Sequence, residues 1–152
     1  MSIEDIKQLM DGFDPASLLP NMDTMLGKTA FLMRILVLLG PIILLALGVA
    51  YLLVSPREAN YHFGYRCYFG MGSKEAWRFT QRIAGLVWGG LGLVLTVVML
   101  LISGSFGKLE PMDMVWKAVW CGVWEAVLIA LACIGINITV AVFFDRSGRR
   151  KR

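Results

Sequence analysis

The residues that could do chemistry in this chain are few and widely spaced. The single histidine, His62, has no partner at metal-ligand spacing, and the sequence contains no Ser/His/Asp or Cys/His set, no zinc-protease motif and no phosphate-binding glycine loop. The three cysteines, Cys67, Cys121 and Cys133, lack CxxC spacing, and we interpret all three as free thiols. The sequence therefore predicts no enzyme, no metal site and no cofactor.

Two charged residues lie in or beside apolar segments. Glu125 is the one acidic residue within a hydrophobic stretch, and a carboxylate inside a membrane is by default a candidate functional group. Counting about twenty residues back from Phe144, the length that crosses a bilayer, places Glu125 near the outer boundary. The same count places Arg34 at the outer edge of the first apolar segment. We predict an Arg34–Glu125 ion pair or a carboxylate that snorkels to the membrane boundary, with a proton or ion site at Glu125 as the alternative.

The segments that carry these charges define the fold class. Of the 152 residues, 57% are hydrophobic, and the mean hydropathy of +0.66 is too high for a soluble domain of this size. The predicted fold is all-α and integral to the membrane, over residues 29–144. Three transmembrane helices are predicted, at about 29–54, 84–103 and 115–144, with the second continuing a helix that starts at Lys74 after an N-cap at Ser73.

The two ends of the chain differ from this domain. Residues 1–28 are predicted to form an N-terminal amphipathic segment that lies on the membrane or on the bundle, or alternatively binds a partner. Residues 145–152 form a basic tail with five of the fifteen Lys/Arg residues. Its position beside the third span favours contact with anionic membrane lipid. We predict no nucleic-acid binding.

Three local patterns bear on how the spans pack. The pair Gly40-Pro41 is expected to kink or loosen the first span. A face of small residues on the second span would let another helix approach closely, within the chain or between protomers of a homo-oligomer: Gly85, Gly89 and Gly92. An aromatic stripe on the third span is interpreted as an interfacial belt or packing surface, with a ligand-stacking cage as the alternative: Trp116, Trp120 and Trp124.

The distribution of basic residues predicts the orientation. With three spans, the loop 55–83 and the C-terminal tail lie on the same side, where they hold ten of the fifteen Lys/Arg residues. The positive-inside rule therefore predicts a multi-pass protein of the cell membrane, with the loop and the C-terminus cytoplasmic and the N-terminus outside.

The loop also carries the most specific residue pattern in the chain. It contains Asn60, the run Gly64-Tyr65-Arg66, then Ser73-x-Glu75-x-Trp77, and then Gln81-Arg82-x-x-Gly85. Over about residues 35–105, this pattern resembles the SdpI family of integral membrane proteins. The family is named for an immunity protein against a secreted sporulation-delaying peptide toxin in Firmicutes. Three positions depart from the family's usual residues: Cys67 replaces a Thr, Tyr68 replaces a Pro that often follows it, and Gln81 replaces a frequent Asn.

The motif residues are the candidate binding residues: Asn60, Gly64, Tyr65, Arg66, Trp77, Gln81 and Arg82. They form a recognition surface, or alternatively they only fold the loop onto the helix ends. Trp77 is placed where an aromatic ring anchors a helix at the membrane interface.

The resemblance implies a small bacterial membrane protein of the immunity or signalling type. Such a protein would bind a peptide toxin, or a small membrane or cytoplasmic protein partner, rather than catalyse a reaction. Two alternatives stay open at this point. One is an oligomeric small transporter or channel, whose protomers would meet on the glycine face of the second span. The other is an accessory subunit of a larger membrane complex.

Overall fold

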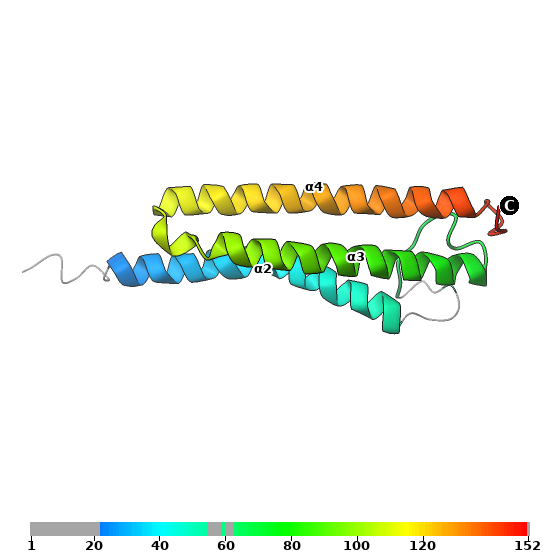
Figure 1. The fold of residues 1–152 in the computed structure, drawn as a ribbon, viewed down its shortest axis with the longest axis horizontal. Helices are drawn as coiled ribbons and strands as arrows, with labels where there is room; N and C mark the ends of the chain where they lie inside the picture. Colours follow the sequence, from blue (N-terminus) through cyan, green and yellow to red (C-terminus); the bar gives the residue numbers. More distant parts are fainter. Residues whose placement is uncertain (1–21, 55–58, 60–62, 152) are drawn as a thin grey trace, which may run out of the picture.

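The computed structural model describes residues 22–54, 59 and 63–151. It contains three long helices, α2 (Met22–Leu53), α3 (Lys74–Ser103) and α4 (Pro111–Phe143), and a short 3-10 helix, η2 (Phe106–Lys108), in the α3–α4 connection. The helices form an elongated antiparallel bundle (Figure 1). We call its two ends the connection end, at residues 104–110, and the loop end, at residues 63–73 and 144–151. The N-terminal segment 1–21, Asn60 and His62 lie outside the described residues.

The predicted all-helical membrane fold is confirmed. All three helices are long and apolar enough to cross a membrane, and the described residues contain no strand, only a single isolated bridge. Large apolar side chains cover the outward faces of the helices; Leu53 is 78% exposed and Leu101 is 76% exposed. A surface of this kind needs lipid as its solvent.

The stripe of tryptophans faces outward as well. Trp116, Trp120 and Trp124 are all exposed, and Trp116 packs edge to face against Trp120 with ring centroids 6.1 Å apart. This placement fits an outward-facing aromatic belt rather than a packing surface inside the bundle.

The start of α3 follows from its capping residue. The Ala76 N–H donates to Ser73 Oγ over 3.1 Å, which satisfies one of the free donors of the first helical turn. Glu75 in that turn adds a favourable charge at the positive end of the helix dipole. The helix then runs without a break into the apolar segment, as predicted.

Close packing of α2 on α3 depends on glycine. Gly48 and Gly89 bring the two backbones together so closely that a Cβ on Gly48 would overlap Gly89. A Cβ on Gly92 would come within 2.5 Å of the Leu45 nitrogen. The small-residue face of α3 is therefore used within the chain, which excludes it as a free surface for contact between protomers.

The remaining helix, α4, is held mainly near its two ends. At the connection end, Phe106, Met114 and Ala118 join a cluster with residues of α2 and α3. At the loop end, Ile136, Val140 and Phe144 pack with Ala76 and Ala84 of α3. α2 stays helical through Pro41, and its second half diverges from α4 (Figure 1).

Candidate functional site

The loop before α3 is held to the bundle by a buried amide. Gln81 is 2% exposed, and its Nε2 donates to the Tyr65 carbonyl over 2.8 Å. The Tyr65 N–H donates back to Gln81 Oε1, also over 2.8 Å. One side chain thus satisfies both backbone groups of a loop residue, as a neighbouring strand would.

Gly64 and Trp77 complete this contact. Gly64 has φ +122°, and a Cβ there would lie 2.7 Å from the Trp77 ring. A side chain would therefore be strained by its backbone angle and blocked by the indole. Trp77 is fully buried under the loop. The prediction that its ring anchors the helix at the membrane interface is wrong, because the loop covers that face of α3.

Tyr65 connects the loop to the third helix. Its hydroxyl donates to the Cys133 carbonyl over 3.3 Å and to Asn137 Oδ1 over 3.4 Å. Its ring packs edge to face on Trp88 with centroids 5.6 Å apart. Burial, followed by the effect of the neighbouring Cys133, raises the pKa of Tyr65, so the hydroxyl stays a hydrogen-bond donor at neutral pH.

The motif residues thus separate into two groups. Gly64, Tyr65, Trp77 and Gln81 come together in what we call the loop clasp. Arg66 and Arg82 are exposed beside it and remain open to partners.

The C-terminal segment is folded, a feature that its basic composition obscured. Phe144 and Arg150 form an isolated antiparallel bridge, and the Lys151 N–H donates to the Phe143 carbonyl over 2.8 Å. Lys151 Nζ also donates to the Ala141 carbonyl over 2.6 Å and lies 5.9 Å from the centroid of the Phe69 ring. We call residues 144–151 the C-terminal hairpin.

A carboxylate and a glycine shape this hairpin. Asp145 Oδ1 accepts hydrogen bonds from the Ser147 N–H (2.9 Å), the Ser147 hydroxyl (2.8 Å) and the Arg149 N–H (2.8 Å). These bonds lower the pKa of Asp145, with the Arg149 N–H as the largest cause. Gly148 has φ +72° and packs against Gly72, and its carbonyl accepts from Ser73 Oγ over 2.7 Å. The signal in the sequence was Asp145-x-Ser147-Gly148, a typical turn pattern.

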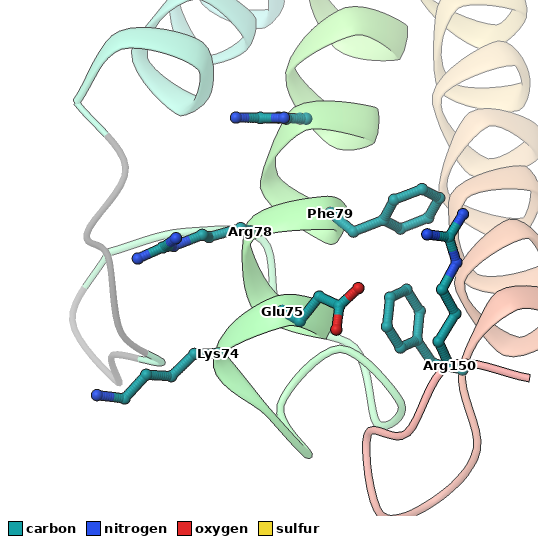
Figure 2. Close-up of a pocket in the computed structure, with 7 residues that line it drawn as sticks. Lys74, Glu75, Arg78, Phe79 and Arg150 are labelled. Atoms are coloured by element: carbon teal, nitrogen blue, oxygen red, sulfur yellow. The ribbon is translucent and has the colours of Figure 1, made fainter.

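A basic groove lies between the hairpin and the first turns of α3 (Figure 2). Its volume is about 510 Å³, and it is lined by Lys74, Glu75, Arg78, Phe79, Arg82, Phe144 and Arg150. Phe79 points toward α4, on the side where Arg150 lies, whereas Lys74 and Arg78 extend from the other side of α3 (Figure 2). The lining thus contains four basic side chains and one carboxylate, Glu75, and the rings of Phe79 and Phe144 pack with centroids 5.3 Å apart.

The predicted ion pair between Arg34 and Glu125 is wrong. Arg34 Nε donates to the Ser103 carbonyl over 3.0 Å, so it caps the C-terminus of α3 at the negative end of the helix dipole. Glu125 instead lies against Gly40, which follows Arg34 by six residues, about 9 Å along α2 at 1.5 Å per residue.

Phe144 lies beyond the predicted second span, so a count of about twenty residues from it places Glu125 too near the outer boundary. Phe144 packs on Phe79, which precedes the start of the predicted second span at Ala84 by five residues. The last turns of α4 therefore extend past that span at the loop end. Glu125 is correspondingly deeper, the fifteenth residue of the 33-residue helix.

Glu125 lies at one end of an apolar groove between α2 and α4. The side chain is 8% exposed, and its carboxylate is so close to Gly40 that a Cβ there would overlap it. Within the described part of the chain, no hydrogen bond or ion pair to Glu125 is found. The groove has a volume of about 340 Å³ and is lined by Met33, Leu36, Val37, Val115, Ala118, Val119, Gly122 and Glu125. We call it the α2/α4 groove.

These features define a small helical multi-span membrane protein with a structured loop at one end of its bundle. Among the described residues, no group of three or more His, Cys, Asp or Glu side chains is placed to hold a metal ion. The chain belongs to the SdpI/YfhL protein family, whose family model matches residues 57–142, more than half of its length. The match takes in the loop clasp, all of α3 and nearly all of α4. Comparisons with curated proteins and with solved structures gave no match.

The loop clasp predicts a stability effect. Gln81→Leu keeps an apolar body of similar size but leaves the Tyr65 N–H and carbonyl without partners. We expect a loss of roughly 2–4 kcal/mol in unfolding free energy, because two backbone groups lose their partners, each fully buried unsatisfied group costs about 1–3 kcal/mol, and Tyr65 is only partly buried. Thermal unfolding in detergent measures this, with the exposed neighbour changed in Arg82→Ala as the control. Equal melting temperatures for both variants would contradict the assigned role of Gln81.

The C-terminal hairpin predicts a dependence on pH. Because the pKa of Asp145 is lower in the folded hairpin than in an unfolded one, its carboxylate stabilises the hairpin above the ordinary Asp value of about 3.9. This stabilisation is lost as the pH falls through the lowered value. A nitroxide on Arg146→Cys, in a chain without its native cysteines, should be ordered at pH 7 and mobile in stronger acid. Asp145→Ala, which removes the acceptor oxygen, should make it mobile at both values; an ordered label in that variant would disprove the assignment.

Proposed function

We propose that this protein is an SdpI-type immunity or signalling protein that binds a peptide within the membrane and does not catalyse a reaction. Family membership supports a membrane protein of this type. The observation that carries the binding proposal is the α2/α4 groove, which has apolar walls and a volume of about 340 Å³. That volume falls at the lower end of the range of about 300–1,000 Å³ for ligand sites.

The place of the groove favours a ligand that comes from outside the cell. Its lining residues lie on the half of the bundle near the connection end. The positive-inside rule assigns that half to the outer leaflet, because most Lys/Arg residues belong to the loop end. A secreted apolar peptide would therefore meet the groove on entering the membrane.

The alternatives have less support. A channel was expected to assemble through the glycines of α3, but α2 already covers that face. An accessory subunit would need a partner surface, for which the exposed Arg66 and Arg82 are the available candidates. A transporter could use the carboxylate of Glu125 as an ion site, but the side chains that line the groove beside it are apolar.

A side chain that fills the α2/α4 groove should abolish the protection that this protein gives a cell against a secreted peptide. Gly122 lines the groove and has no atom within 4 Å of a Cβ added there, so the side chain in Gly122→Leu can leave the backbone freely and fill part of the groove. Gly135 has equally open surroundings on the same helix but lies outside the groove, and Gly135→Leu is the matched control. The assay exposes a susceptible bacterium to a panel of secreted membrane-active peptides. Cells that make wild type or Gly135→Leu should survive at least one of these peptides about tenfold better than cells without the protein. Gly122→Leu should lose this protection.

The proposal fails if no peptide is resisted in cells that make the protein, or if Gly122→Leu protects as well as Gly135→Leu. Immunoblots of the membrane fraction establish that all three chains accumulate equally.

We also propose that the basic groove holds the headgroup of an anionic phospholipid. It lies beyond the predicted start of the second span, where headgroups are found, and its lining combines four basic side chains with Glu75 and two phenylalanines, which leaves an excess of positive charge. Each basic residue near an anionic surface contributes about 1 kcal/mol. Native mass spectrometry should show phosphatidylglycerol retained by wild type, and by the exposed control Lys108→Ala, but reduced about tenfold or more in Arg82→Ala/Arg150→Ala. If wild type retained phosphatidylcholine as well as phosphatidylglycerol, this proposal would be contradicted.

A further inference from the structure

Glu125 is a deeply placed acid, and no cationic side chain among the described residues forms an ion pair with it. Arg34 is committed to the Ser103 carbonyl, and Lys117 donates to Ser105 Oγ over 3.1 Å at the connection end. Lys117 precedes Glu125 by eight residues, about 12 Å along α4. Intramembrane carboxylates ordinarily pair with a cation or face a polar cavity. Here the neighbouring side chains of the groove are apolar.

Two glycines, Gly40 and Gly122, also leave space for the side chain of Glu125. Gly40 leaves room for the carboxylate directly on the backbone of α2, where any larger residue would overlap it. Gly122, one turn before Glu125 on α4, leaves the groove open beside it. Two glycines on two helices therefore make space around one acid, and that space continues as an apolar groove toward the connection end.

We infer that the α2/α4 groove recognises a membrane-inserted peptide by a single cationic group. The apolar body of the peptide lies along Met33, Leu36 and Val119, and its ammonium group meets the carboxylate of Glu125. The inference rests on the proposed function in that the ligand is a peptide, and it adds the chemistry by which that peptide is selected. A buried charge pair adds discrimination because a neutral peptide leaves the carboxylate unpaired.

The test uses two synthetic peptides of about twenty Leu and Ala residues, a length that spans the hydrocarbon region. One carries a single lysine about six residues from its outer end, and its twin carries norleucine there. Both bear a dansyl group and are titrated against the protein in phosphatidylcholine nanodiscs, with energy transfer from tryptophan as the signal and empty nanodiscs as the blank. Wild type should bind the lysine peptide at least about tenfold more tightly than the norleucine peptide.

Two variants examine the carboxylate. Glu125→Gln keeps the size of the side chain, and Gly40→Ala displaces the carboxylate without removing it. Both should bind the lysine peptide only as tightly as the norleucine peptide. Gly122→Leu should weaken the binding of both peptides, and Gly135→Leu should bind them as wild type does. The melting temperature of each variant confirms that it is folded.

The outcomes separate the two proposals. Equal binding of the twins to wild type, with both lost in Gly122→Leu, would overturn the role of Glu125 and leave peptide binding in the groove intact. A preference for lysine that persists in Glu125→Gln and Gly40→Ala would also overturn it. Binding that Gly122→Leu leaves unchanged would overturn the groove as the site, and with it this inference.

Discussion

The arrangement of this bundle depends on the contact between the backbones of α2 and α3 at Gly48 and Gly89. That contact fixes how far one helix is shifted along the other, because a side chain at Gly48 would push the backbones apart. With the shift fixed, Arg34 meets the last turn of α3 and donates to Ser103. Gly40 then stands at the level of Glu125, and the acid is left without the arginine that the sequence suggested for it.

A second constraint acts at the loop end: the backbone N–H and carbonyl groups of the loop need hydrogen-bond partners where the loop packs on the bundle. The amide of Gln81 satisfies the backbone of Tyr65, and the Tyr65 hydroxyl reaches α4. The C-terminal hairpin then joins the start of α3 through Ser73 and Gly148. Together these contacts hold the basic residues of α3 and the hairpin around one groove, although they come from distant parts of the chain. The same contacts place the last turns of α4 beyond the second span.

Several features could be predicted from the sequence because they depend on local patterns. The three spans follow from the length of the apolar runs, the start of α3 follows from Ser73, and close packing follows from the glycines at positions 85, 89 and 92. The sequence pattern of the loop motif could be recognised, but the direction in which each of its side chains points could not be predicted. Its pattern gives no sign that Gln81 and Trp77 face inward while Arg66 and Arg82 face outward, because that depends on how the loop folds over α3.

Other features depend on contacts between distant segments and were missed or mistaken. The depth of Glu125 was counted from Phe144, but Phe79 holds Phe144 outside the span. The hairpin was interpreted as a free basic tail, because five positive charges dominate its composition while the Asp145 turn depends on backbone donors. In both cases the charges were evident in the sequence, whereas the packing that places them was not.

The measurement that tests this account most directly is disulfide formation between α2 and α4 in native membranes. In a chain whose cysteines at positions 67, 121 and 133 have been replaced, two pairs would be compared: Gly40→Cys with Glu125→Cys, and Arg34→Cys with Glu125→Cys. A disulfide needs Cα atoms within about 7 Å. We predict rapid crosslinking of the first pair and none of the second. Crosslinking of the second pair alone would restore the Arg34–Glu125 contact and contradict the depth of the carboxylate on which the proposed site depends.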